Sequence, residues 1–148
     1  MFSPRRILVP TDFSEDSDEA LKQALELADQ YHAKVYLLHV TEPVTQCAGD
    51  FCLDETAVRA AGDSEKTHAR EMMQKELSKF SQWRDIEVIS DIREGVPAVE
   101  ILREQDERGV DLIVMPSHKK TGFMKRLMGQ ISEQIMEEAK TPVLLVRH

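Results

Sequence analysis

The sequence predicts a single α/β domain in which helices cover both faces of a parallel sheet. Short apolar runs of strand length alternate with longer segments in which apolar residues recur every three or four positions. The apolar runs, such as VYLL and LIVM, are nearly continuous, which is typical of strands buried on both faces. A chain of 148 residues suits one domain, and we therefore assign residues 1–148 to it.

Five strands and four helices alternate along this chain. The strands are predicted at residues 6–10, 34–40, 86–92, 111–115 and 142–147. The first helix follows Asp12 or Ser14, either of which offers a side-chain N-cap, and its apolar stripe runs to Tyr31. Further helices are predicted at residues 63–80, from Pro97 onward, and at residues 131–139. This β-α-β order favours right-handed crossovers and hence a parallel sheet.

The charge and hydropathy of the chain exclude several classes of protein. With 19 Lys and Arg against 27 Asp and Glu, the net charge of −8 disfavours general binding to nucleic acid or to an anionic membrane. No apolar stretch reaches the roughly 18 residues of a membrane span. The apolar run at residues 7–9 is too short for a signal sequence. We therefore expect a cytoplasmic protein with no nucleic-acid or membrane partner.

Two connections are longer than the usual two to six or so residues of such units. Residues 41–62 form a polar excursion, and residues 116–129 follow the fourth strand. From residue 116 to residue 132 the chain has no acidic residue but has Lys119, Lys120, Lys125 and Arg126. This segment favours an anionic ligand at the N-terminus of the last helix, although the same charges equally suit a solvated basic loop.

The first long connection carries both cysteines of the chain, Cys47 and Cys52. We expect ordinary reduced thiols in a loop, which agrees with a reducing compartment. Two alternatives stay open: a zinc site completed by His39 or His68, and a reversible redox pair. Elsewhere, His118 follows Ser117, but adjacent side chains seldom face one another and no orienting acid is apparent, so we expect no catalytic residues.

Four segments together resemble the universal stress protein family over essentially the whole chain. They are the strand and turn at residues 7–12, the Gly95-Val96-Pro97 block, the run at residues 111–115 and the ending at residues 142–146. The resemblance implies a Rossmann-like, three-layer domain of the adenine nucleotide alpha-hydrolase-like type. It also implies a five-stranded parallel sheet of order 3-2-1-4-5 and a cytoplasmic homodimer. In one branch of the family an adenine nucleotide binds between the first and fourth strands.

That nucleotide-binding branch carries a glycine pattern which this chain matches at one position. The pattern is Gly, two residues, Gly, nine residues, then Gly followed by Ser or Thr, and it falls on Pro116, Lys119, Gly129 and Gln130. Pro116 has no N–H, and Lys119 brings a side chain where close backbone approach to phosphate is needed. Gln130 replaces a small hydroxyl, for which Ser132 is a partial substitute. The phosphate-binding loop is therefore degenerate.

By resemblance, the nucleotide-binding positions of this chain lie at the strand ends and in the loop after the fourth strand. They are Pro10, Thr11, Asp12, Val40, Pro116, Ser117, His118, Lys119, Gly129, Gln130, Ile131 and Ser132. Asp12 would meet the ribose through its carboxylate, and Val40 would meet the adenine through its backbone. Each also has a structural role that explains it equally well, because Asp12 suits an N-cap and Val40 ends a buried strand.

The last strand contains the apolar run Val143, Leu144, Leu145 and Val146. In a sheet of order 3-2-1-4-5 this strand lies at an edge, where unpaired backbone groups favour pairing with another chain. We therefore predict a homodimer through this strand, as the family resemblance also implies.

The function that follows is a non-catalytic, cytoplasmic stress-response protein that requires no cofactor and no metal. The main alternative is a nucleotide-gated switch that binds ATP or AMP with Mg²⁺ and hydrolyses ATP slowly at most. In this alternative Lys119 or Lys120 replaces the missing backbone contacts to phosphate. A weaker alternative is a thiol or metal sensor built on Cys47 and Cys52.

Overall fold

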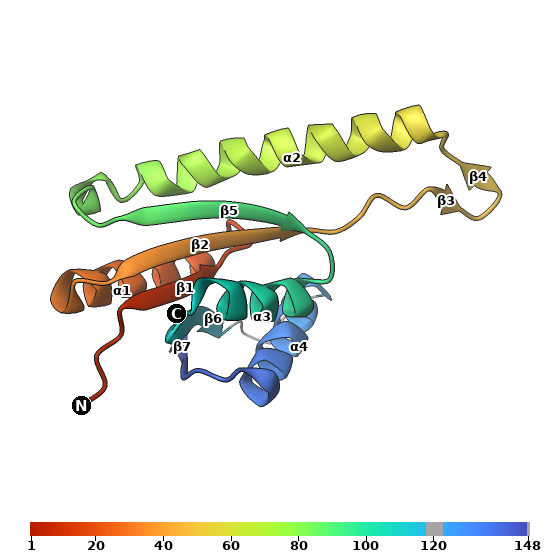
Figure 1. Ribbon diagram of the computed structural model, residues 1–148. Helices are drawn as coiled ribbons and strands as arrows, with labels where there is room; N and C mark the ends of the chain where they lie inside the picture. Colours follow the sequence, from red (N-terminus) through yellow and green to blue (C-terminus); the bar gives the residue numbers. More distant parts are fainter. Residues whose placement is uncertain (118–122, 148) are drawn as a thin grey trace.

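A computed structural model, which describes residues 1–117 and 123–147, contains a parallel sheet between two layers of helices (Figure 1). The strands of this sheet are β1 (Arg6–Pro10), β2 (Lys34–Thr41), β5 (Val88–Glu94), β6 (Leu112–Ser117) and β7 (Val143–Arg147). They lie in the order β5-β2-β1-β6-β7, and every neighbouring pair is parallel. The predicted α/β class and the strand order 3-2-1-4-5 are therefore confirmed.

The three central strands supply most of the core because both of their faces are covered. Ile7 of β1 pairs with Val35 of β2 on one side and with Leu112 of β6 on the other. Ile7, Leu8 and Val9 are fully buried. The edge strands β5 and β7 contain only exposed and half-buried residues. This gradient is the reason that the central strands read as continuous apolar runs.

One helical pair packs on each face of the sheet (Figure 1). The helices are α1 (Glu15–Tyr31), α2 (Glu55–Ser78), α3 (Pro97–Arg108) and α4 (Phe123–Glu138), and a 3₁₀ turn (Ser81–Trp83) follows α2. Leu21 of α1 and Met73 of α2 belong to one apolar core, whereas Ile101 of α3 and Ile135 of α4 belong to the other. The molecule thus has three layers, as expected for a doubly wound fold.

Helix starts and ends follow local side-chain chemistry. Ser14 is the N-cap of α1 and accepts a hydrogen bond from the backbone N–H of Ser17, so Ser14 rather than Asp12 caps this helix. Pro97 occupies the first turn of α3, and Gly109 ends that helix at φ +62°, a left-handed conformation that glycine adopts without strain.

Two helices begin earlier than the sequence pattern predicted. Helix α2 begins at Glu55 instead of residue 63, because Asp54 caps it by accepting from the N–H of Ala57 at 2.7 Å. Its first turns carry no buried stripe, so the periodic apolar signal was absent there. Helix α4 begins at Phe123 instead of residue 131. Gly129 lies inside this helix, where glycine costs about 1 kcal/mol without ending it.

The first long connection forms an arm, residues 42–62, that extends past the end of the sheet (Figure 1). It contains a short antiparallel hairpin of β3 (Cys47–Ala48) and β4 (Phe51–Cys52), followed by the first turns of α2. The hairpin residues are exposed. The predicted polar excursion is therefore partly regular structure.

Candidate functional site

A small cavity lies at the carboxyl ends of β1, β2 and β6, the place where ligands bind in open parallel sheets. Its volume is about 70 Å³. It is lined by Pro10, Thr11, Asp12, Leu38, His39, Val40, Pro97, Ile101, Met115, Pro116 and Ile131. Most of these side chains are apolar, and the polar ones come from the ends of β1 and β2. We call this cavity the strand-end pocket.

The polar side of the strand-end pocket is built around Thr11. The carbonyl oxygen of Thr11 lies 2.7 Å from Nδ1 of His39, and its N–H donates to the carbonyl of Leu38 at 2.8 Å. Phe13 adopts φ +66°, and its ring centroid lies 4.3 Å from that of His39. The N–H of Phe13 donates to Oγ1 of Thr11 at 3.0 Å. These contacts join the ends of β1 and β2 directly to one another.

The Asp12 carboxylate organises the turn from β1 into α1. Oδ1 of Asp12 accepts hydrogen bonds from the N–H and hydroxyl of Ser14 and from the hydroxyl of Ser17, the last at 2.6 Å. The Ser17 hydroxyl lies 3.2 Å from the N–H of Asp12 and accepts from it. The carboxylate thus has a structural role in this turn, while the residue also lines the strand-end pocket.

A buried acid lies directly behind the strand-end pocket. Glu76 of α2 is 2% exposed, and its Oε2 accepts a hydrogen bond from the Thr11 hydroxyl at 3.0 Å. Burial, together with hydrogen bonding to Asp18, raises the pKa of Glu76 to about 8. Asp18 in turn pairs with Nζ of Lys79 at 2.7 Å. At neutral pH Glu76 is therefore a neutral acid beside a carboxylate.

Pro116, Gly129 and Gln130, the described residues of the expected phosphate-binding pattern, are not arranged as a backbone cradle. Pro116 lines the strand-end pocket, but it lies within β6, where it pairs with Val146, and it has no N–H to donate. Gly129 and Gln130 lie inside α4, so their N–H groups do not form the free N-terminus of a helix. The expectation that the loop opens the last helix at these residues is wrong, because α4 begins at Phe123.

The remaining predicted positions are only partly brought together. Ile131 lines the strand-end pocket, whereas Ser132 is buried and Gln130 is exposed, and neither reaches it. Ser117 is half-buried at the end of β6. His118, Lys119 and Lys120 lie outside the described residues. The strand-end pocket therefore unites the predicted base and ribose positions with Pro116, whereas Gly129 and Gln130 do not line it.

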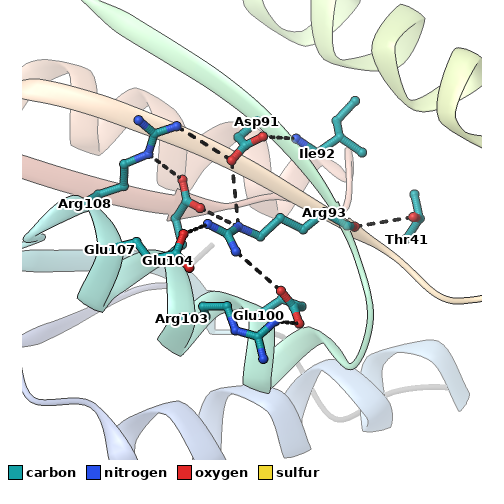
Figure 2. Close-up of polar contacts among 9 residues, drawn as sticks. All are labelled: Thr41, Asp91, Ile92, Arg93, Glu100, Arg103, Glu104, Glu107 and Arg108. Carbon is teal, nitrogen blue, oxygen red and sulfur yellow. Dashed lines mark hydrogen bonds and ion pairs between the residues drawn. The ribbon is translucent and has the colours of Figure 1, made fainter.

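An ion-pair network fastens α3, one wall of the pocket, to strand β5 (Figure 2). Nε of Arg93 lies 2.6 Å from Oε2 of Glu104, a carboxylate that is 0% exposed. Oε1 of Glu104 also pairs with Nε of Arg108 at 3.1 Å, and Arg93 contacts Glu100 and Glu107 as well. These carboxylates raise the pKa of Arg93 above its ordinary value. The network fixes the helix that carries Pro97 and Ile101.

The arm bounds a second, larger hollow of about 410 Å³ between the β2–β3 connection and α2. It is lined by Pro43, Val44, Gln46, Glu55, Val58, Arg59, Gly62, Asp63, Lys66 and Glu94. Lys66 and Glu94 form an ion pair across it at 3.5 Å, with both side chains more than 40% exposed. The mixed charges on its walls do not converge on one ligand chemistry.

Cys47 and Cys52 are joined in a disulfide across the β3–β4 hairpin. The expectation of ordinary free thiols is therefore wrong, because the hairpin register places the two cysteines directly opposite one another. The agreement of the cysteines with a reducing compartment loses its support for the same reason. Disulfide sulfurs are not thiolate ligands for zinc. Among residues 1–117 and 123–147, no group of three or more His, Cys, Asp or Glu side chains is placed to hold a metal.

The predicted dimer strand β7 pairs with β6 and lies at the edge of the sheet. Leu144 is 40% exposed, and Val143, Leu145 and Val146 are half-buried. Within the described part of the chain, no helix is both long and apolar enough to cross a membrane.

Sequence reasoning missed several residues of the site. Ile101 lines the strand-end pocket and Glu76 supports it from behind, and neither was expected there; His39 and Met115 also line it, and they were expected at strand ends but not assigned to the site. His39 precedes a predicted strand end, so its position in the chain was a usable signal. Glu76 gave no signal, because an acidic residue in an otherwise polar helix is ordinarily exposed.

The fold and the strand-end pocket define a doubly wound α/β protein with a cavity at its topological switch point. The model of the universal stress protein family matches residues 4–147, which is nearly the whole chain. The chain belongs to the universal stress protein family.

Known relatives agree with this assignment. Universal stress protein MJ0531 of Methanocaldococcus jannaschii is 32% identical over 97% of this chain and 82% of its own length. The solved structure of MJ0577, from the same organism, is 28% identical and has a TM-score of 0.79, covering 99% of this chain and 98% of that one. A universal stress protein solved in complex with cAMP has the same fold, with a TM-score of 0.73 at 18% identity over 99% of this chain and 98% of its own.

Proposed function

We propose that this protein is a non-catalytic, cytoplasmic stress-response protein that works as a homodimer and binds an adenine nucleotide weakly at the strand-end pocket. The observation that carries the proposal is the pocket itself, an apolar cavity at the switch point with Thr11, Asp12 and His39 at one side. The cAMP complex of a protein with this fold supports an adenine nucleotide as the ligand class.

Weak binding follows from two features of the pocket. Its volume of about 70 Å³ is well below the usual range of about 300–1,000 Å³ for small-molecule sites, so the walls must open to admit a nucleoside. Pro116 removes one backbone donor, and the N–H groups of Gly129 and Gln130 are used inside α4. The base and ribose therefore supply the binding energy, while the phosphate adds little.

Calorimetric titration with AMP and with ATP tests this proposal. We expect both to bind with similar dissociation constants, on the order of 0.1 to 1 mM, because their shared nucleoside makes the contacts. Replacement of Pro116→Gly restores a backbone donor, and it should tighten ATP binding more than it affects adenosine binding. If neither AMP nor ATP gives heat at millimolar concentration, nucleotide binding is removed from the proposal.

A nucleotide-gated switch is the second candidate, favoured by the basic, acid-free stretch of sequence from residue 116 to residue 132. In this function Lys119 or Lys120 contacts the phosphates as a point charge, with Mg²⁺ between them. The same titration separates the two candidates. A switch binds ATP with Mg²⁺ at least about tenfold more tightly than AMP, a difference of about 1.4 kcal/mol, and any hydrolysis appears as slow release of phosphate.

A further inference from the structure

Glu76 is a buried carboxyl group that the proposed binding function does not itself use. It lies on α2, a helix whose other residues are largely exposed, and it is 2% exposed. An ionised carboxylate in such a place is costly unless a cation pairs with it. The nearby cation is Lys79, but its Nζ is bonded to Oδ2 of Asp18 at 2.7 Å. Glu76 is thus stable in its place as a neutral acid.

Two buried carboxyl oxygens without a hydrogen-bond donor indicate where the proton of Glu76 lies. Oε1 of Glu76 and Oδ1 of Asp18 are both buried, and neither meets an N–H or hydroxyl donor. A protonated carboxyl is itself a donor, so one proton on Glu76 that is shared with Asp18 satisfies both oxygens. The hydrogen bond to Asp18 is also one of the causes that raise the pKa of Glu76.

The other carboxyl oxygen of Glu76, Oε2, is hydrogen-bonded to Thr11, which lines the strand-end pocket. Oε2 accepts from Oγ1 of Thr11, and this same Oγ1 accepts from the N–H of Phe13. Phe13 has φ +66°, a conformation that is strained for an aromatic residue and therefore needs external support. Its ring packs at a tilt of 32° against that of His39, which lines the pocket. Glu76 is thus one hydrogen bond away from the pocket wall without lining it.

Because of the charged groups around Glu76, its hydrogen bond to Thr11 depends on whether the carboxyl group is protonated. Asp18 of α1 and Lys79 at the end of α2 act on the Glu76 carboxyl group, Glu15 of α1 acts on Lys79, and His39 of β2 lies on the far side of Thr11. When Glu76 ionises, its buried carboxylate and the half-buried carboxylate of Asp18 share one lysine, Lys79. They relieve the repulsion by moving apart, which takes the acceptor away from Thr11.

We propose that Glu76 is a positioning residue of the strand-end pocket, which holds Thr11 and the Phe13–His39 pair in place while it is neutral and releases them when it ionises. The part of this proposal that concerns a ligand rests on the proposed nucleotide binding. The structural part, the control of Thr11 by Glu76, needs no ligand. On ionisation the polar side of the pocket, Thr11 with the Phe13–His39 pair, loses its preorganisation, so binding weakens as the pH rises.

Titration of the protein without ligand tests the structural part. The methyl resonance of Thr11, followed by NMR from about pH 6 to about pH 9.5, should shift with a midpoint close to the Glu76 pKa of about 8. Glu76→Gln should abolish this transition, because the amide can accept from Thr11 and donate to Asp18 but cannot ionise. Glu71→Gln, an exposed glutamate on the same helix, is the matched control and should titrate like the wild type.

Calorimetric titration with AMP from about pH 7 to about pH 9.5 tests the effect on binding. Above about pH 7 the phosphate of AMP is already ionised, so its own titration does not interfere. The wild type and Glu71→Gln should lose affinity by about fivefold or more through the transition, whereas Glu76→Gln should give a flat profile. Thr11→Val, which removes the hydroxyl that Glu76 binds, should also flatten the profile, and it provides a second variant if Glu76→Gln does not fold.

The outcomes separate the two proposals. A Thr11 transition that Glu76→Gln abolishes, with no AMP heat at any pH, overturns nucleotide binding and leaves the control of Thr11 by Glu76 established. AMP binding with no Thr11 transition, or with the same transition in Glu76→Gln, overturns the positioning role and leaves nucleotide binding standing. Affinity that rises with pH in the wild type also overturns the positioning role.

Discussion

At the scale of single residues, the buried Glu76 makes the stability of the protein depend on pH. Its pKa is raised from an ordinary 4.5 to about 8 in the folded protein, so between these values the folded state holds a proton that the unfolded chain has lost. The stabilisation is complete below about pH 4.5 and is lost as the pH rises through 8. The expected slope is at most about 1.4 kcal/mol of unfolding free energy per pH unit.

Urea unfolding of the wild type and Glu76→Gln at several pH values measures this effect. The unfolding free energy of the wild type should fall relative to that of Glu76→Gln as the pH rises from about 5 to about 8, and the difference should stay constant above that. If the unfolding free energies of the two proteins depended on pH in the same way, Glu76 would not be a buried neutral acid.

Arg93, which pairs with the buried Glu104, is a second residue whose replacement should strongly lower the unfolding free energy. Glu104 is fully buried, and Arg93→Met leaves its carboxylate with Arg108 alone, at 3.1 Å. We expect a loss of about 3 kcal/mol in unfolding free energy, since the buried carboxylate then keeps one cationic partner instead of two and an incompletely compensated buried charge is expensive. Adding Glu104→Gln to Arg93→Met should recover part of the loss, because the buried charge is then removed.

The exposed pair of Lys34 and Glu87 is the control for this prediction. Its atoms lie 3.5 Å apart, and both side chains are at least half exposed. Lys34→Met should therefore cost less than about 1 kcal/mol. Equal losses for Arg93→Met and Lys34→Met would show that burial does not set the strength of the Arg93 network.

At the scale of secondary-structure elements, the arm is an independent unit. Its disulfide links two hairpin residues five positions apart, and Leu53 donates its N–H to the carbonyl of Gln46 at 2.7 Å. By restricting the unfolded chain, a disulfide across so short a loop stabilises the hairpin by about 2 kcal/mol. Because the hairpin residues are exposed, the sheet does not depend on them.

Replacement of both cysteines by serine tests this independence. Hydrogen exchange of the Leu53 amide should become faster, while exchange at Leu37 in the buried strand β2 should stay unchanged. Reduction of the wild type with a dithiol should reproduce the result. Faster exchange at Leu37 would mean that the arm supports the sheet.

At the scale of the whole molecule, β7 is the surface through which we expect two copies to pair. It is an edge strand, and Leu144 is 40% exposed on it. Leu144→Lys places a charge on this edge, and it should raise the dimer dissociation constant by about tenfold or more, or about 1.4 kcal/mol. Sedimentation equilibrium measures this change.

Phe51→Lys is the matched control for the dimer. Phe51 is 68% exposed and lies on the arm, far from β7 in the fold (Figure 1). This variant should leave the dissociation constant unchanged. A wild-type protein that stays monomeric at micromolar concentration contradicts the predicted dimer, and an equal effect of both variants contradicts its location.

Much of the fold was predictable because buried positions recur in the sequence as a regular pattern of apolar residues. The apolar runs of β1, β2 and β6 marked the central strands, and their order followed from the family resemblance. The starts of α2 and α4 were not predictable, because the first turns of α2 bury no side chain and α4 continues through Gly129. The strand-end positions Pro10, Thr11 and Asp12 were predictable, because parallel strands bring their carboxyl ends to one edge.

By itself, the sequence determined the α/β class, the strands and the loss of the glycine pattern at Pro116, since these depend on local residue identity. Only the tertiary structure decided that Gly129 and Gln130 lie inside a helix, that Cys47 and Cys52 face one another, and that Glu76 is buried against Thr11. These features depend on which distant segments meet in space. The charge state of Glu76 depends on that meeting, because α1, α2 and β1 together exclude water from its carboxyl group.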